Sequence, residues 1–274
     1  MTSLPSWSDY GTYDESAYPD LWNGVVGYWA PCLGPTGLRL HDVSRYANWG
    51  TLTQTSGSNL VDWVLQPTMR GSFYAIRGKQ NAIVECTNSN SLNIRESTIT
   101  VAVWWNYASH NDWQALVYKS GGNFAGYQLF VDNLNQVQWG THTTGSGFGR
   151  LNGGLVNTSG LNHIVCTLNQ QRRVYINGAI TATSGNVSGT ITDSSGFALW
   201  LSGFNFGDQY NRGSILDVVI STQPWNAAQV QIAYQLGPGG MLQRRSRRRA
   251  YVEPAGFRAH YASQRSRIIG GGLK

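Results

Sequence analysis

Hydrolysis of a glycosidic bond requires two carboxylates held at a set separation, and the glutamates of this chain are not spaced to provide them. They are Glu15, Glu85, Glu96 and Glu253, and the one acidic neighbour at short range is Asp14, directly before Glu15. Adjacent residues of a strand point to opposite faces, so this pair does not converge on one substrate. The acidic residues therefore do not predict a glycosidase.

Metal-dependent and nucleophilic chemistry has no better support. No two histidines have HxH, HxxxH or HExxH spacing, and no serine lies in a GxSxG elbow. The glycine-rich run 145–149 is not followed by Lys-Thr or a helix, so it fits no nucleotide site. We predict no catalytic residue, no resident cofactor and no enzyme activity. The histidines are His41, His110, His142, His163 and His260.

Aromatic and amide side chains offer a different chemistry, the non-covalent recognition of sugars. Aromatic rings stack on the apolar faces of sugars, while Asn and Asp side chains bind hydroxyl groups. The competing interpretation is core packing, because most tryptophans of a β-rich protein are buried. The aromatic candidates are Trp104, Trp105, Tyr107, Trp113, Trp139, Trp200 and Phe204. The predicted glycan-binding residues are Trp113, Trp139, Asn205, Asp208 and Asn211.

Positive charge is concentrated at the end of the chain. Residues 244–274 carry nine basic residues and one acid, a formal charge of +8, whereas the first 243 residues carry 11 basic and 13 acidic residues. Such a segment can bind phosphates of nucleic acid, remain solvated, or dock on an acidic protein surface. Interleaved aromatic and Ile side chains favour docking, with nucleic acid as the alternative. The predicted docking residues are Arg244, Arg245, Arg247, Arg248, Arg249, Phe257, Arg258, Tyr261, Arg265, Arg267, Ile268 and Ile269.

Composition indicates a β-rich protein with many turns. Charged residues make up 12% of the chain, about half of the usual share, while glycine (33) and tyrosine (14) are plentiful. Cys32, Cys86 and Cys166 are far apart and form no CxxC pair, which disfavours structural zinc. Cys86 and Cys166 lie in apolar runs, so we predict buried free thiols and folding in a reducing cytoplasm.

The N-terminal residues predict neither secretion nor membrane insertion. They contain no basic segment followed by an apolar one, as a secretory signal would. No apolar run approaches the ~20 residues that a membrane-spanning helix needs. We therefore expect synthesis in a cytoplasm, with lysis or particle assembly as the route out of the cell.

Short apolar runs separated by Gly, Asn, Ser and Asp predict a β-sandwich. One helix is expected at 226–235, because Asn226 is a good N-cap and Gly237 with Pro238 provides a stop. The dipeptide Asn177-Gly178 between apolar residues predicts a type I′ hairpin. The expected strands cover residues 25–29, 60–65, 72–76, 82–86, 98–105, 115–118, 127–131, 136–139, 163–168, 173–176, 197–201 and 214–220.

Several motifs resemble those of a known fold family. His163–Leu168 followed by Arg173–Gly178 is similar to the central hairpin of concanavalin A-like jelly rolls of the laminin-G type. The resemblance implies a two-sheet antiparallel jelly-roll sandwich with a concave face. Together with the sequence patterns, it predicts an all-β fold with one short C-terminal helix and extended N- and C-terminal arms. The implied domains are an arm at 1–22, a jelly roll at 23–237 and a tail at 238–274. The other matching segments, in family order, are Gly24–Trp29, His41–Ser44, Asn48–Leu52, Thr98–Trp104 and Gly213–Val218.

The resemblance also raises calcium binding. Members of the family often have two adjacent acids in the strand that closes the fold, but here Leu216 precedes Asp217. This departure weakens the case for an inherited calcium site. By family analogy, the remaining candidate ligands are Asp42 and Asp208.

The tail resembles the ends of laminin-G-like proteins that tailed bacteriophages encode. The segments that carry this resemblance are 239–249, 257–261 and 268–272. It implies a virion structural protein, present in several copies and attached by its tail to capsid or tail proteins, with decoration of the capsid favoured. The alternative function is a carbohydrate-binding adhesion module for host-surface glycans.

Overall fold

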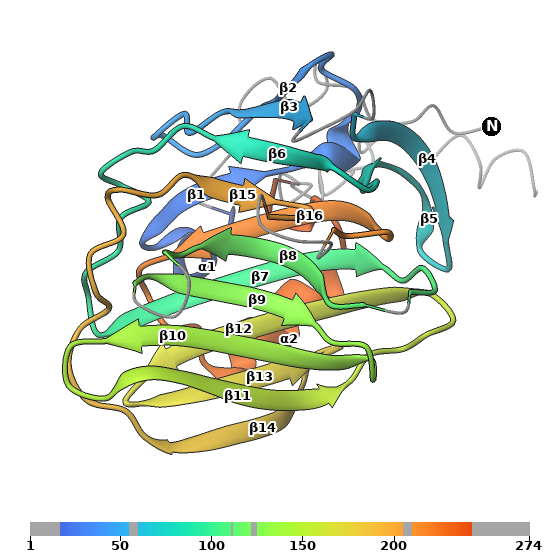
Figure 1. Ribbon diagram of the computed structural model, residues 1–274. Helices are drawn as coiled ribbons and strands as arrows, with labels where there is room; N and C mark the ends of the chain where they lie inside the picture. Colours follow the sequence, from blue (N-terminus) through green and yellow to red (C-terminus); the bar gives the residue numbers. More distant parts are fainter. Residues whose placement is uncertain (1–16, 55–59, 111, 122–124, 205–209, 243–274) are drawn as a thin grey trace, which may run out of the picture.

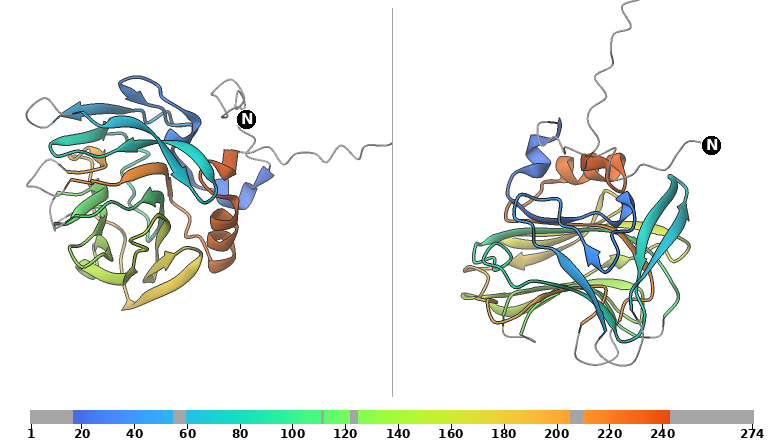
Figure 2. Two further views of the ribbon diagram at one scale, coloured as in Figure 1. Left: turned by 90° about the vertical axis from the view of Figure 1, so that its right-hand side faces the viewer. Right: turned by 90° about the horizontal axis from the view of Figure 1, so that it is seen from above.

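A computed structural model describes residues 17–54, 60–110, 112–121, 125–204 and 210–242. In these residues the chain forms two antiparallel sheets packed face to face, with helical segments on one outer side (Figures 1 and 2). The prediction of an all-β, two-sheet sandwich is confirmed. No helix in these ranges is long and apolar enough to cross a membrane.

The first sheet, called sheet A, contains eight strands in the described residues. Its spatial order is β14-β13-β12-β7-β16-β5-β4, and β1 pairs with the remaining part of β16. Strand β7 lies near its middle and pairs with both β12 and β16. The strands are β1 (Val25–Trp29), β4 (Asp62–Thr68), β5 (Gly71–Arg77), β7 (Thr98–Asn106), β12 (Leu161–Asn169), β13 (Gln171–Ile176), β14 (Ala179–Asn186) and β16 (Ser214–Ser221).

The second sheet, called sheet B, also contains eight strands in the part of the chain described. Its spatial order is β11-β10-β9-β8-β15-β6-β3-β2, and it is the sheet nearest the viewer in Figure 1. The strands are β2 (Arg39–Leu40), β3 (Gly50–Gln54), β6 (Ala82–Cys86), β8 (Gln114–Lys119), β9 (Tyr127–Val131), β10 (Gln136–Thr143), β11 (Gly147–Leu155) and β15 (Leu199–Leu201).

The main core lies between the sheets. Strand β7 contributes Val101, Val103 and Trp105, and Trp139 of β10 joins them from the opposite sheet. The indole Nε1 of Trp139 donates to the carbonyl oxygen of Thr167 at 3.2 Å, so even this polar atom is satisfied inside the sandwich. All three cysteines are buried and free, which confirms the prediction for the two that was made from the apolar runs.

A helical layer covers the outer face of sheet A. It consists of α1 (Pro19–Trp22), α2 (Ala227–Leu236) and the 3₁₀ segments η2 (Pro31–Leu33) and η3 (Gly240–Leu242). Asn226 caps α2, because its side chain accepts from the Gln229 N–H while the Gln229 side chain accepts from the Asn226 N–H. The expected helix is therefore present, and its buried residues pack against sheet A.

Two predicted boundaries are corrected by this layer. Leu21 and Trp22, assigned to an N-terminal arm, are buried in the same cluster as Met241 and Leu242, assigned to the tail. The Trp22 indole donates to the Met241 carbonyl oxygen at 3.2 Å. Residues at both ends of the described chain thus belong to the folded domain, because their apolar side chains complete the cover of sheet A.

The local predictions differ in accuracy for a structural reason. Asn177 and Gly178 have φ of 52° and 84° and join β13 to β14, as expected for a type I′ turn. Strands β1, β6 and β9 have the predicted bounds. Strand β11 was not predicted, since its sequence, GFGRLNGGL, contains four glycines and few β-formers.

Candidate functional site

The outer face of sheet B carries a row of side chains that crosses seven strands. Consecutive members are direct cross-strand partners, so they share one face of the sheet. In spatial order the row contains Thr51, Glu85, Trp200, Tyr118, Gln128, Gly140 and Arg150. We call this surface, together with the rings described next, the aromatic face.

Aromatic rings gather in the middle of this face. The Tyr118 ring stacks on Trp200 at 5.7 Å with 8° between planes, and it lies 4.7 Å from Phe204. Phe130 meets Tyr118 edge-on at 5.8 Å, and Trp113 meets Phe130 edge-on at 6.0 Å. Such edge-to-face and stacked contacts fix the rings and provide a rigid apolar platform. Trp113 and Phe204 remain partly exposed.

Arg150 lies at the β11 end of the platform. Its guanidinium carbon is 4.8 Å from the centre of the Trp113 ring, 5.5 Å from Phe148 and 5.9 Å from Phe130. Phe148 and Arg150 alternate along β11 and therefore point to the same side. Partial burial lowers the pKa of Arg150 from its ordinary value, but a guanidinium stays charged at neutral pH.

Gly140 leaves room between its two neighbours on the row. A Cβ at this position would lie 2.8 Å from the Cγ and Nε2 of Gln128, so the Gln128 side chain crosses the glycine. Gln128 is 3% exposed, and in the part of the chain that the structure describes its Nε2 has no hydrogen-bond partner. The aromatic face therefore combines the partly exposed rings of Trp113 and Phe204 with the exposed cation of Arg150 and the buried amide of Gln128.

Two carboxylates of this side of sheet B, those of Glu85 and Asp132, accept hydrogen bonds. Glu85 accepts from the Trp200 indole at 3.1 Å and is exposed. Asp132, after β9, accepts from the Gln138 amide at 2.6 Å and from the backbone N–H groups of Leu134 and Gln136. These acids orient their own surroundings, and among the described residues neither forms an ion pair with Arg150.

The predicted glycan-binding residues separate into three groups. Trp113 lies on the aromatic face, as do Trp200 and Phe204 from the wider set of aromatic candidates. Trp139 and Asn211 are fully buried, so they present no surface to a sugar and the glycan-binding prediction is withdrawn for them. Asn205 and Asp208 lie outside the described residues.

Asn211 is buried because it completes the core around Trp105. Its Oδ1 accepts from the Trp105 indole at 2.9 Å and from the Gly213 N–H at 2.8 Å. Its amide donates to Ser202 Oγ and to the Gly213 carbonyl oxygen. Trp104, which directly precedes Trp105 in β7, points to the other side of sheet A and stacks on His163 and Tyr234.

Asp42 does not fit the calcium role suggested by family analogy. Its Oδ1 accepts from the N–H groups of Tyr28 and Ser44, and its Oδ2 accepts from Ser44 Oγ and the Asn48 N–H, all at 2.7–2.8 Å. Four donors around one carboxylate organise the loop before β3 and leave no acceptor directed at a cation. Asp208 is outside the described residues, within which no group of three potential metal ligands occurs.

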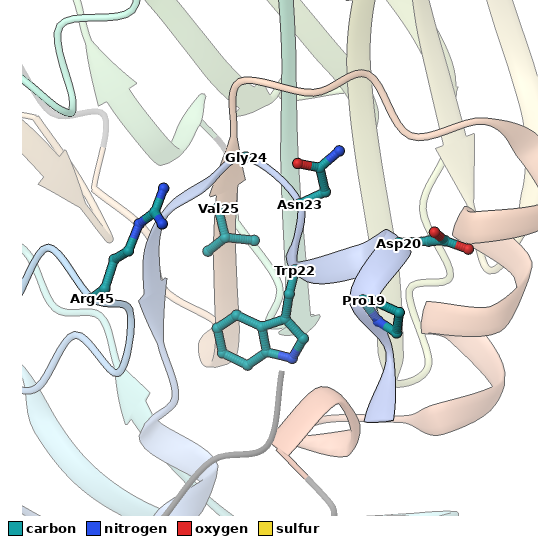
Figure 3. Close-up of a pocket in the computed structure, with 7 residues that line it drawn as sticks. All are labelled: Pro19, Asp20, Trp22, Asn23, Gly24, Val25 and Arg45. Carbon is teal, nitrogen blue, oxygen red and sulfur yellow. The ribbon is translucent and has the colours of Figure 1, made fainter. Parts of the chain in front are cut away.

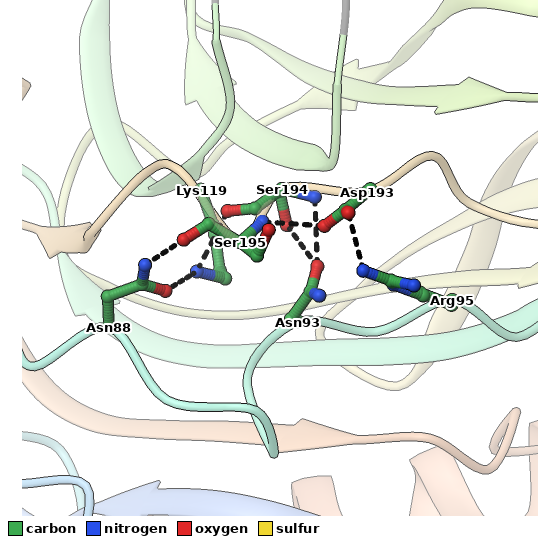
Figure 4. Close-up of polar contacts among 7 residues, drawn as sticks. All are labelled: Asn88, Asn93, Arg95, Lys119, Asp193, Ser194 and Ser195. Atoms are coloured by element: carbon green, nitrogen blue, oxygen red, sulfur yellow. Dashed lines mark hydrogen bonds and ion pairs between the residues drawn. The ribbon is translucent and has the colours of Figure 1, made fainter.

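A buried lysine at the end of β8, next to Tyr118 of the aromatic face, connects this strand to two loops. Lys119, directly after Tyr118, is fully buried and donates to Asn88 Oδ1 at 3.0 Å (Figure 4). It also donates to the Phe197 carbonyl oxygen at 2.6 Å. Burial lowers its pKa to about 8. The ammonium thus joins two loops, at 88–93 and 193–197, to the end of β8. The surrounding contacts involve Asn93, Arg95, Asp193, Ser194 and Ser195.

Asp217, the acid retained in the closing strand, lies on the opposite side of the molecule. Its Oδ2 accepts from Tyr28 Oη at 3.0 Å and from the Gly239 N–H at 2.8 Å, beneath the helical layer. Burial raises its pKa to about 7. Its role is therefore to hold the end of the described chain on sheet A rather than to bind a ligand.

Sequence reasoning missed Phe148, Arg150 and Gln128 as members of the site. Phe148 and Arg150 lie in β11, which was not predicted. Without that strand, the alternation of side chains could not place them on the same face as Gln128 of β9. The signal available was Phe148-x-Arg150-x-Asn152, a period of two hidden among glycines. All predicted docking residues, from Arg244 to Ile269, lie outside the described part of the chain.

The chain has relatives that share this fold. The family model Laminin_G_3, described as the concanavalin A-like lectin/glucanases superfamily, matches residues 78–231, more than half of the chain. No curated protein matches it by sequence.

Three solved structures illustrate the likeness. The binding domain of Paraclostridial Mosquitocidal Protein 1 is 15% identical with a TM-score of 0.59, over 78% of this chain and 52% of that chain. Botulinum neurotoxin type C, described as entering cells through two ganglioside molecules, is 13% identical with a TM-score of 0.56, over 82% and 53%. Domain 4 of AbnA, an extracellular arabinanase of Geobacillus stearothermophilus, was solved with arabinotriose and is 13% identical with a TM-score of 0.56, over 76% and 97%. The chain spans about half of the toxin chains and nearly all of the arabinanase domain, and at these identities the likeness concerns the fold.

Proposed function

Because the chain belongs to the concanavalin A-like lectin/glucanases superfamily, we propose that it is a glycan-binding module that holds a sugar on the aromatic face of sheet B. The observation that carries the proposal is the partly exposed Trp113 ring beside Phe148 and Arg150, on a platform of interlocked rings. Rings recognise the apolar faces of sugars, and nearby N–H donors recognise their oxygens.

The relatives agree with this chemistry without defining the ligand. One of them carries arabinotriose, and another is described through its interaction with gangliosides. The arabinanase domain is the more informative of the two, since nearly its whole length corresponds to this chain. We take from it that this fold can serve as a binding module on its own.

We propose binding without hydrolysis. Glu85 is the carboxylate in the row across the aromatic face, and its direct partners there, Thr51 and Trp200, are neutral. Hydrolysis needs a second carboxylate at a defined distance across the sugar. The absence of any such partner in this row supports a recognition role.

Measurement of glycan binding by the purified full-length chain tests the proposal, first on an array and then by calorimetry on each positive sugar. We expect Trp113→Ala to weaken binding by about tenfold or more, because a ring at the centre of a binding site contributes strongly. The matched control is Tyr46→Ala, an exposed ring that also carries an arginine, Arg45, at 5.1 Å.

Arg45 lies beside α1, on the side of the molecule that carries the helical layer, in the depression shown in Figure 3. The control variant should bind as the parent protein does. Equal losses in both variants, or no loss in the Trp113 variant, would exclude the aromatic face as the site.

We also propose that the module is displayed on a phage particle by its basic tail. The supporting observation is the charge of +8 in residues 244–274 against a body of opposite sign. Capsid or tail proteins with an acidic surface are the partners proposed for it. Both ends of the described chain lie on the helical side of the sandwich, away from sheet B (Figure 2), which is compatible with display of the aromatic face.

Truncation after Leu242 tests this second proposal, because it keeps the buried Met241 and Leu242 that complete the fold. The truncated chain should fold and bind glycan but fail to join particles. Normal incorporation of the truncated chain into particles would refute attachment through the tail.

A further inference from the structure

The guanidinium of the exposed Arg150 packs against aromatic rings and has no ion-pair partner among the described residues. The guanidinium carbon lies 4.8 Å from the centre of the Trp113 ring and 5.5 Å from the centre of the Phe148 ring. A guanidinium that stacks uses its flat face, while its five N–H donors lie in the plane and point outward. Stacking also limits the motion of the side chain, so less entropy is lost when those donors bind an anion.

No protein anion is paired with this cation in the described residues. The ion pairs found there are Lys79 with Asp62 and Arg95 with Asp193. Asp132 is engaged by three donors, and Glu85 lies five strands away along the row, about 24 Å at the usual strand spacing. Arg150 is therefore exposed and packed against rings, and its N–H donors have no carboxylate acceptor among the described residues.

A second donor lies on the same row. Gln128 is separated from Arg150 by Gly140 alone. The side chain is 3% exposed, and its Nε2 has no hydrogen-bond partner within the described ranges. An unsatisfied buried N–H group is costly, so a ligand that provides an oxygen there gains the corresponding stabilisation. Both groups offer N–H donors, and this end of the aromatic face thus favours an anion.

We propose that the β11 end of the aromatic face recognises an anionic group, a carboxylate or a sulfate ester, on the bound sugar. This inference rests on the proposed glycan-binding function and adds the class of ligand. Arg150 supplies the bidentate contact, Trp113 and Phe148 keep the guanidinium in place, and Gln128 provides the donor across Gly140. The Glu85 end of the row would then hold uncharged sugar units, since a carboxylate repels an anion.

Matched pairs of oligosaccharides test the ligand class. Each pair has the same chain with and without the charge: sialylated and desialylated, glucuronate and glucose, sulfated and unsulfated. Calorimetry with the full-length protein should give at least about tenfold tighter binding of one charged member than of its neutral partner, as expected for a charge-assisted hydrogen bond. The preferred pair identifies carboxylate or sulfate as the group recognised.

Arg150→Gln should reduce this preference to near one, because the charged donor of the site is lost. Arg150→Lys keeps the charge but loses the planar pair of donors, so it should restore part of the preference. Arg45→Gln, which removes another ring-stacked arginine, is the matched control and should change nothing. The preference of the parent protein should also decrease as salt is added.

The outcomes separate the two proposals. Equal binding of charged and neutral members, with loss of both in Trp113→Ala, overturns the anion inference and keeps the glycan-binding function. A preference that survives Arg150→Gln overturns the assignment to this end of the face. No binding of any glycan by the folded parent protein overturns both proposals together.

Discussion

The two outer faces of the sandwich are built from similar aromatic and aliphatic residues but are completed differently. On sheet A, Ala102, Val165 and Val219 are covered by Val230 and Ala233 of α2. On sheet B no helix of the described chain lies over the rings, and Trp113 and Phe204 stay partly exposed. The first face is covered by helices of the chain itself, whereas on the second two rings keep part of their surface exposed.

The two faces differ in the burial pattern along their strands. All eight residues of β16 are buried, because one side of the strand faces the core and the other faces the helical layer. Strand β11 alternates between partly buried and exposed positions. The exposed side chains of Arg150 and Asn152 on β11 mark the face that solvent reaches, while continuous apolar residues mark the covered one.

The largest effect is expected where the cover meets sheet A. Val230→Asp places an unpaired carboxylate at a fully buried site and should lower the free energy of unfolding by about 4–5 kcal/mol. Ile232→Asp, on the same helix but 43% exposed, should cost less than about 0.5 kcal/mol. Urea denaturation measures both. Similar costs for the two variants would mean that α2 does not close sheet A.

Asp217 should give the covered face a characteristic pH dependence. Its folded pKa, raised to about 7 by burial, exceeds the ordinary value of 3.8, so its contribution is fully present below pH 4 and is lost as pH rises to about 7. The Asp217→Asn variant has no carboxyl group at this position, so it does not lose stability in this way as pH rises. The unfolding free energy of the variant minus that of the parent protein should therefore increase by about 3 kcal/mol between pH 4 and pH 7.

His163, beneath the same helical layer, opposes this trend. Burial lowers its pKa to about 3, so its contribution is complete above pH 6.5 and is lost as pH falls toward 3. The two slopes partly cancel in the parent protein between pH 4 and 6.5, and the difference between variant and parent isolates Asp217. A difference that is flat across this range would contradict the assignment.

Lys119 tests the support behind the aromatic face. Lys119→Met leaves the acceptors of Asn88 and Phe197 without their donor and should cost about 2 kcal/mol at pH 7. In the parent protein, stability should rise between pH 8 and pH 10.5 because the unfolded chain binds the extra proton there, and the variant should lack that rise. Thermal unfolding at several pH values distinguishes these outcomes.

The smallest effect on stability is expected on the open face itself. Trp113→Ala removes a partly exposed ring and should lower the unfolding free energy by less than about 1 kcal/mol, although it should weaken the proposed glycan binding by about tenfold or more. Comparison of its denaturation midpoint with its binding isotherm provides the check. A loss of several kcal/mol would make Trp113 a structural residue and would weaken the contrast between the faces.

The fold was predictable from the sequence to a greater extent than the site. The predicted strand at 98–105 and the Asn177-Gly178 turn rest on local signals, and both predictions are confirmed. Asn211 was expected to bind a sugar because it lies in a polar loop, yet its partner Trp105 is 106 residues away and no local pattern connects them. Trp139 lies two residues after Val137 in β10, so both point into the core. Predicting this requires knowing which face of the strand is buried.

The pairing of β1 with β16 also determines when the domain can fold. Ser221 donates to the Asn23 carbonyl oxygen across 198 residues, and Val25 pairs with Ser221 itself. During synthesis the first strand therefore leaves the ribosome well before its partner exists, with apolar Val25, Val26 and Trp29 unprotected. Such long-range closure slows folding and exposes the nascent chain to aggregation. Production of the protein should accordingly benefit from slow translation or from chaperones that bind the emerging first strand.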